Sequence, residues 1–313
     1  MKSIELIKPR NPLLVIAWAF GLYVLAYTTQ YVYFWIGSIV TGATFGELAG
    51  GELKTYEAVF LRGLVGLFLG VPATFLVVKY LWRRPWCWLR IQFHGRHILW
   101  GALIGVGVAV AAIAFLGAIG FARITGLPGR FSAGQLVSLL IGHFGWVVFI
   151  SILEESVFRG MVVREFALRW GWPVAALLGG LFFAAIHLIG IFPILTPQLI
   201  GTILVAGTAA SALFTALYVR SHSLWFPIGF HAGWNFALAA LLGATMSGRA
   251  RGFGLFRTEL SGPELLTGGE FGVEASVVAL AMTIVIVVCV LCIPRRGDLL
   301  SSRPPEKAAN SEN

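Results

Sequence analysis

Apolar stretches of about 20 residues recur along this chain of 313 residues, and they constrain its fold more than any other feature. A stretch of that length is what a helix needs to cross the hydrocarbon core of a bilayer. Hydrophobic residues make up 58% of the sequence and charged residues only 12%, about half the charged share of a soluble domain. A soluble protein could not bury that much apolar surface, so we expect an integral membrane protein.

The apolar pattern predicts an all-α fold, a polytopic transmembrane helix bundle of about eight helices. The fourth candidate span is too long for one straight crossing, and Gly142, His143 and Gly145 in its first part indicate a bend or an interfacial segment. We expect a multi-pass protein of the cell (plasma) membrane. The candidate spans lie near residues 12–38, 58–82, 97–121, 136–168, 173–192, 199–219, 224–245 and 274–293.

Basic residues predict the orientation, because cytoplasmic loops of membrane proteins are enriched in Lys and Arg. With the N-terminus inside, the inner segments collect most of the basic residues and the outer segments hold acidic ones. An even number of spans then places both the N- and C-termini in the cytoplasm. The net charge of +9 therefore reflects topology, and no nucleic-acid partner is expected.

Two adjacent glutamates lie inside the fourth candidate span, in Glu154-Glu155-Ser156-Val157-Phe158-Arg159. A carboxylate at the bilayer centre costs about 2.5–3.5 kcal/mol, so such residues usually face the protein interior and have a function. Helical spacing places Glu155 and Arg159 one turn apart, which favours a structural ion pair. Glu154 points about 100° away around the helix and has no evident partner nearby in the sequence.

Three further polar side chains lie in apolar segments: His187, which follows Phe183 by one turn, and His231, which precedes Asn235 by one turn. If residues 169–173 form the turn between two helices, Glu154 and His187 are almost equally far from Gly171 along the chain. At about 1.5 Å per residue both then lie about 25 Å from that turn, at the same depth. We expect these polar groups to meet inside the bundle.

These residue types suit the attack of water on an amide. Glu154 beside a neutral His187 can hold a water, take its proton and later return it to the leaving amine. His231 and Asn235 can donate hydrogen bonds to a carbonyl oxygen that becomes an oxyanion. Other intramembrane protease designs fit poorly, because there is no His-Glu-x-x-His zinc helix, Asp298 is the only aspartate, and no serine lies in a recognisable nucleophile motif.

At these residues the sequence resembles the CPBP family, also called the Abi or CAAX-protease-like family of intramembrane glutamic endopeptidases. The family motifs Glu-Glu-x-x-x-Arg, Phe-x-x-x-His and His-x-x-x-Asn/Asp occur here in order over about residues 136–245. The resemblance implies that Glu154 and His187 activate the water and that His231 and Asn235 form the oxyanion hole. Glu155 and Arg159 would support the site, as would the Phe183 ring.

The resemblance suggests a division of the chain into four parts. Residues 1–135 would hold the first three transmembrane helices, 136–245 the CPBP-like catalytic core, 246–300 an outer loop and the last transmembrane helix, and 301–313 a disordered tail. The expected partners are the lipid bilayer and a membrane protein or lipidated peptide as substrate. Whether that substrate is prenylated, and the oligomeric state, do not follow from the sequence.

Three alternatives stay open beside the metal-free protease, for which no cofactor is expected. Glu154, His187 and His231 could bind zinc with an open coordination position, as in a metal-dependent protease. A non-catalytic immunity or scaffold protein would use the same residues as a buried hydrogen-bond network that fixes helix packing. A transporter would use the glutamate and the histidines as a proton relay.

Overall fold

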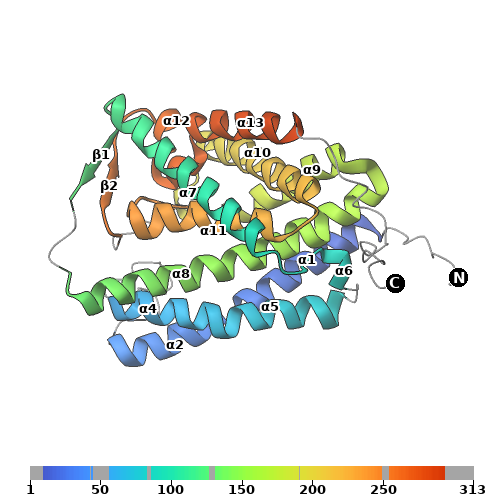
Figure 1. Cartoon of the computed structure of the whole chain (residues 1–313), viewed down its shortest axis with the longest axis horizontal. Coiled ribbons are helices and arrows are strands. Elements are labelled where there is room, and N and C mark those ends of the chain that lie inside the picture. The colour runs from blue at the N-terminus through green and yellow to red at the C-terminus, as the bar shows by residue number, and fades with distance from the viewer. Residues whose placement is uncertain are drawn as a thin grey trace, which may run out of the picture.

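The computed structural model describes residues 10–42, 44, 56–82, 86–126, 131–189, 191–248 and 254–292. These residues form a helical bundle with one two-stranded antiparallel ribbon, in which Ala122 pairs with Leu260 and Thr125 with Arg257 (Figure 1). The predicted tail at 301–313 lies outside the described residues. The elements are α1 (Pro12–Tyr27), α2 (Gln30–Thr41), α4 (Tyr56–Val65), α5 (Val71–Val77), α6 (Trp86–Leu89), α7 (Gly95–Ala118), β1 (Ala122–Thr125), α8 (Ala133–Glu155), α9 (Arg164–Ile189), α10 (Pro197–Ser221), α11 (Trp225–Phe236), β2 (Arg257–Leu260), α12 (Glu264–Thr267) and α13 (Val277–Cys292).

Short π- and 3₁₀-helical segments link or extend these helices. The π-helical segments are Gly66–Gly70, Val78–Trp82, Ser156–Val163 and Ala237–Leu241, and the 3₁₀ segments are Phe192–Ile194, Gly269–Phe271 and Val273–Ala275. One π-helical segment begins directly after Glu155 and joins α8 to α9. Single π-helical turns inside α-helices often occur at functional sites.

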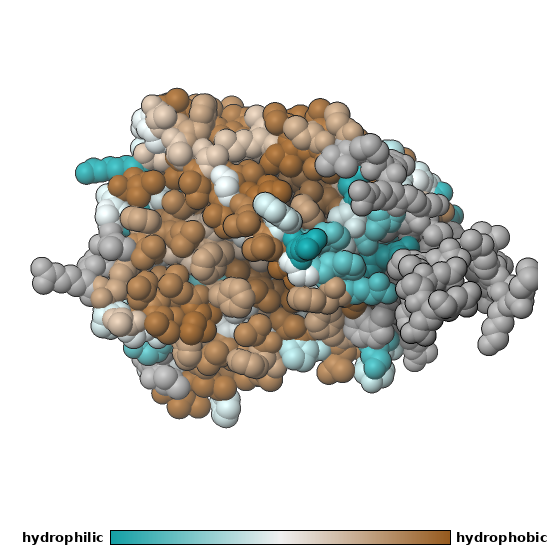
Figure 2. All heavy atoms as spheres, in the orientation of Figure 1, coloured by the Kyte–Doolittle hydropathy of each residue, from teal (hydrophilic) through white to brown (hydrophobic). Residues whose placement is uncertain are grey.

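Four helical stretches among the described residues are long and apolar enough to cross a membrane: Tyr56–Tyr80, Gly95–Ala118, Ala133–Ile189 and Pro197–Ser221. Pro12–Leu25 and Val277–Cys292 are shorter apolar helices. Figure 2 shows the consequence on one face, where apolar atoms cover most of the helical surface and polar atoms gather toward one end. The predicted helical membrane fold is confirmed, while the count of eight crossings and the cytoplasmic placement of both termini stay predictions.

The long stretch Ala133–Ile189 turns back on itself at Gly171, whose φ of 77° and ψ of 167° are not helical. A positive φ is easy for glycine, which has no Cβ, and Pro173 follows it. The predicted turn at 169–173 is therefore present. After this turn, the second part of α9 packs against the π-helical segment Ser156–Val163 and carries His187 near its end.

The expected bend at Gly142, His143 and Gly145 is wrong. These residues are buried within one continuous helix, α8, which Figure 1 shows between α4 and α5 on one side and α11 on the other. A Cβ at Gly142 would lie 2.4 Å from the carbonyl oxygen of Val59 on α4. The glycines therefore allow close contact between α4 and α8, in the way that small residues pack membrane helices.

A similar contact holds α11 in place. A Cβ at Gly229 would lie 2.4 Å from the Ile98 oxygen, and one at Gly233 would lie 2.2 Å from the Ala102 oxygen, both on α7. Residues two positions apart on a helix point about 200° apart, so His231 and Asn235 face away from α7. The small residues on one face of α11 therefore direct its two polar side chains toward the bundle interior.

Candidate active site

A largely apolar cavity of about 370 Å³ lies inside the bundle. Its wall is formed by α1, α7, α8, α9, α10, α11 and α13 together with the loop after α11. The four side chains predicted to be catalytic all line it: Glu154, His187, His231 and Asn235. Three separate helices, α8, α9 and α11, thus bring their polar residues to one cavity.

Glu154 reaches the cavity from the end of α8 and is only 5% exposed. The hydroxyl of Tyr23 on α1 donates to its Oε1 over 3.5 Å. Nε2 of His231 lies 3.9 Å from its Oε2. The contacts of Glu154 with Tyr23 and His231 therefore come from other helices, as the lack of a partner nearby in the sequence suggested, and Glu154 still lines the cavity.

Glu155 forms the predicted ion pair and a second contact that the sequence did not suggest. Its Oε1 accepts a hydrogen bond from Nη1 of Arg159 at 3.1 Å and lies 2.9 Å from Nδ1 of His231. An ionised carboxylate only accepts hydrogen bonds, so Nδ1 of His231 carries the hydrogen. Glu155 thereby orients the His231 ring so that Nε2 is on the side of Glu154.

Arg159 is fully buried and packs against aromatic rings from two other helices. Its guanidinium carbon lies 4.6 Å from the ring centres of Phe183 on α9 and Phe214 on α10. Phe214 in turn stacks on His231, with ring centres 5.1 Å apart. Cation–π contacts of this kind stabilise a desolvated arginine. Of the predicted supporting residues, Phe183 thus lines the cavity, and Arg159 lies directly behind the Phe183 and Phe214 rings.

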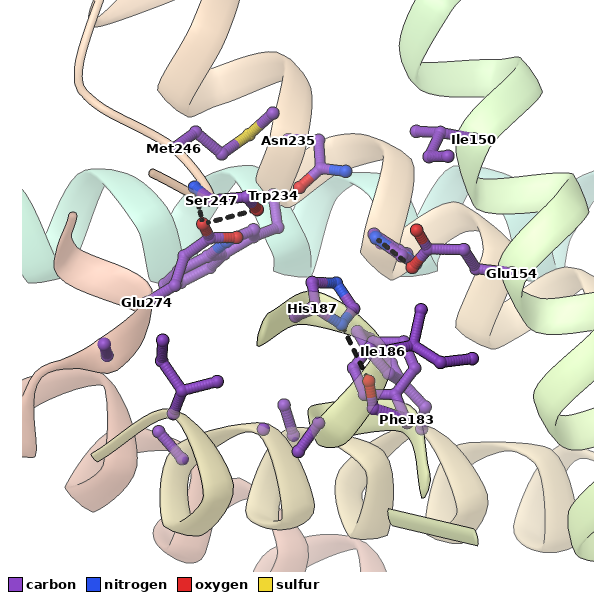
Figure 3. A pocket seen from close by; sticks show the side chains of 18 of the residues that line it. Ile150, Glu154, Phe183, Ile186, His187, Trp234, Asn235, Met246, Ser247 and Glu274 are labelled. Atoms are coloured by element: carbon purple, nitrogen blue, oxygen red, sulfur yellow. Dashed lines mark hydrogen bonds and ion pairs between the residues drawn. The ribbon is translucent and has the colours of Figure 1, made fainter. Parts of the chain in front are cut away.

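His187 is held by its own helix. Nδ1 lies 2.8 Å from the carbonyl oxygen of Phe183, one turn earlier, and because a carbonyl oxygen only accepts, Nδ1 carries the hydrogen. In the neutral ring this leaves Nε2 as an acceptor. Figure 3 shows the His187 ring in the cavity, with Glu154 to its right and Asn235 above it in this view. Glu154 and His187, which are almost equally far from Gly171 along the chain, thus line the same cavity.

Two further polar groups of the cavity were missed from the sequence. Tyr23 comes from α1, far from every motif, and Glu274 comes from the 3₁₀ segment before α13. Glu274 accepts hydrogen bonds from the backbone nitrogen of Ser247 at 2.6 Å and from its hydroxyl at 3.0 Å. No local sequence pattern marks either residue, because only the packing of distant helices brings them to the cavity.

The predicted zinc set has no ready-made geometry in the part of the chain that the structure describes. No three His, Cys, Asp or Glu side chains there are arranged to hold one metal ion. Of Glu154, His187 and His231, the glutamate and His231 approach each other, but Nδ1 of both histidines is engaged elsewhere. Nε2 of each ring could still coordinate a metal ion, so zinc binding stays a prediction that metal analysis tests.

Comparison with known proteins supports one family. Residues 135–237, about a third of the chain, match the family model described as type II CAAX prenyl endopeptidase Rce1-like. The matched range contains all three predicted motifs, whereas α1 and the segment with Glu274 lie outside it. The chain matches no curated protein.

Proposed function

Because residues 135–237 form a domain of the Rce1-like family, we propose that this protein is an intramembrane endopeptidase. It hydrolyses a peptide bond of a membrane-associated protein or peptide with a water activated by Glu154 and His187. One observation carries the proposal: an acid, two imidazoles and a carboxamide line a single cavity with a mostly apolar wall, inside a bundle of membrane-length helices. A general base and hydrogen-bond donors for an oxyanion are the groups that amide hydrolysis needs.

In the first step the water lies between the Glu154 carboxylate and Nε2 of His187. The water oxygen attacks the carbonyl carbon of the substrate, and its proton passes to Glu154. Nε2 of His187 accepts the other hydrogen of the water in a hydrogen bond, because Nδ1 is held as the donor by the Phe183 carbonyl. This hydrogen bond orients a lone pair of the water toward the substrate carbon.

The negative charge that develops on the carbonyl oxygen is stabilised by the side-chain amide of Asn235 and by His231. Nδ1 of His231 already donates to Glu155, so donation to the oxyanion comes from Nε2 and requires a doubly protonated ring. The tetrahedral intermediate then collapses: the C–N bond breaks, the leaving nitrogen takes the proton from Glu154, and the carboxylate is restored.

The test is cleavage of dye-labelled membrane peptides by the purified full-length protein in detergent or nanodiscs. We expect that Glu154→Gln and His187→Ala remove cleavage while the proteins keep the wild-type thermal unfolding temperature. Glu270→Gln is a matched control, because Glu270 is exposed and does not line the cavity. Unchanged cleavage in both site variants would overturn the proposal.

The same preparations separate the remaining alternatives. Stoichiometric zinc whose removal abolishes cleavage would favour the metal-dependent protease with Glu154, His187 and His231 as ligands. A Glu154→Ala protein that unfolds would favour the non-catalytic scaffold. Proton-coupled flux in vesicles without any peptide cleavage would favour the transporter.

A further inference from the structure

Apart from its histidines, the cavity lining carries charge of one sign only. Its described lining residues include two carboxylates, Glu154 and Glu274, and neither lysine nor arginine. Arg159 lies behind the wall and is paired with Glu155. The rest of the wall is mostly aliphatic and aromatic, so a charge placed against it is screened less than in bulk water, and electrostatic interactions there are stronger.

Glu274 has capacity for a further hydrogen bond. Both contacts with Ser247 go to its Oε2, whereas Oε1 accepts from the indole N–H of Trp234 over the long distance of 3.4 Å. A carboxylate oxygen offers two lone-pair sites, so Oε1 can accept again. Figure 3 shows the Glu274 carboxylate at the opposite side of the cavity from Glu154, with His187 between them in this view.

This arrangement discriminates between substrates by charge. A peptide end with a free carboxylate beside Glu274 would lose part of its hydration and meet a like charge, with no lysine or arginine of the described lining to pair with it. His231, the ring that carries a charge in the proposed reaction, is already bonded to Glu155 and lies beside Glu154. Like charges that are brought together in a desolvated site are strongly disfavoured. A cationic side chain or an amino group would instead gain a charge-assisted hydrogen bond from Oε1 of Glu274.

We propose that Glu274 is a specificity residue that selects apolar peptides carrying a cationic group, and that the enzyme does not anchor its substrate by a free C-terminal carboxylate. This inference rests on the proposed function, since it names the substrate class of the same cavity. It assigns recognition to a residue outside the range 135–237 that matches the family model.

A purely structural reading of Glu274 makes a different prediction. In that reading the carboxylate only fastens the loop at Ser247 to α11 through Trp234, and its loss would weaken the binding of all peptides equally. Glu274→Gln keeps an acceptor oxygen and removes the charge. Ser247→Ala removes one hydrogen bond to the carboxylate and keeps the charge, so the two variants separate the two roles.

The experiment measures binding of dye-labelled apolar decapeptides to the full-length Glu154→Gln protein in nanodiscs, so that binding is read without cleavage. The peptides differ at one position (Lys, Gln or Glu) and at the C-terminus (free carboxylate or amide). We expect the best-placed Lys peptide to bind at least tenfold more tightly than its Glu counterpart, and amidation not to weaken binding. The added change Glu274→Gln should reduce the Lys preference to about twofold or less, whereas Ser247→Ala and the control Glu270→Gln should keep it.

Equal binding of the Lys and Glu peptides, a preference that survives Glu274→Gln, or its equal loss in Ser247→Ala would overturn the inference. Tighter binding of the free-carboxylate peptides would also overturn it. The same peptides are then offered to the protein with Glu154 intact. Selective binding without cleavage would reject the proposed protease and keep the charge selectivity, whereas cleavage without selectivity would do the reverse.

Discussion

Two arginines five positions apart on the same continuous helical stretch are both almost completely buried, yet their partners differ. Arg159 contacts Glu155, Phe183 and Phe214, and through them the cavity. Arg164 donates to the hydroxyl of Tyr218 at 2.9 Å and to the carbonyl oxygen of Trp88, and it packs over the Trp88 ring.

The comparison separates a buried charge that serves a site from one that serves the fold. The two aromatic partners of Arg159 line the cavity, and Glu155 orients His231. Neither Trp88 nor Tyr218 lines it, and their contacts with Arg164 tie α9 to α6 and to the end of α10. Burial of a charge inside a membrane protein is therefore not enough to mark a catalytic region, and its connection to a cavity has to be established.

The largest expected effect is on catalysis at the centre of the first region. Glu154→Gln removes the general base with little change in volume, and we expect kcat to fall by about 10³-fold or more, equivalent to about 4 kcal/mol of transition-state stabilisation. The thermal unfolding temperature should stay within a few degrees of the wild type. If the variant unfolds instead, Glu154 serves the fold, as Arg164 does.

Glu155→Ala leaves the buried Arg159 without its carboxylate partner. Breaking one side of a buried ion pair costs about 3–5 kcal/mol, so we expect a large decrease in stability in denaturant titration. Cleavage should also fall in the fraction that remains folded, because His231 loses the hydrogen bond to Nδ1. Full activity in the folded fraction would show that the contact with His231 has no role in catalysis.

Arg164→Met tests the second region. It leaves the Trp88 carbonyl and the Tyr218 hydroxyl without this donor, which should cost about 1–3 kcal/mol of stability. Because Arg164 does not line the cavity, kcat per folded molecule should remain within about threefold of the wild type. A threefold change in kcat is a change of less than about 1 kcal/mol in the activation free energy. A loss of kcat without a loss of stability would show that Arg164 also serves the site, which would contradict the distinction from Arg159.

Gly105→Ala tests whether the site also depends on the placement of α11. Its Cβ would lie 2.2 Å from the carbonyl oxygen of Phe230, next to His231, whereas a Cβ at Gly107 on the same helix meets nothing within 4 Å. We expect Gly105→Ala to cost about 1–3 kcal/mol and to lower kcat, as overpacking does. Gly107→Ala should be neutral or slightly stabilising in the same unfolding and cleavage assays.

Tyr23→Phe should have the smallest effect. It keeps the ring, which packs 6.1 Å from Phe158, and removes only the hydroxyl that donates to Glu154 over 3.5 Å. Because a distance of 3.5 Å makes this a weak hydrogen bond, its loss should cost only about 1 kcal/mol, so kcat should fall about fivefold with KM unchanged. Tyr56→Phe, far from the cavity lining, is the matched control, and a change confined to KM would indicate that Tyr23 contacts the substrate instead.

The sequence by itself determined the helical membrane class, the turn at Gly171 and the polar residues that share the cavity. The physical reasons are local: hydropathy over about 20 residues, the helical repeat, and the free-energy cost of charges in lipid act along the chain. Spacing alone predicted the pairing of Glu155 with Arg159. It also misjudged Gly142 and Gly145 as signs of a bend, because the same glycines serve a close contact that only the position of α4 reveals.

Only the tertiary structure decided which side chains face one another across helices. Glu155 accepts from His231 as well as from Arg159, Tyr23 reaches Glu154 from α1, and Glu274 enters the cavity from the segment before α13. These contacts depend on how separate helices pack. Glycines let two helix backbones come close together, and aromatic rings stack between segments that are distant in the sequence. No pattern within a single helix encodes them, so the acids and imidazoles could be read from the sequence but their partners could not.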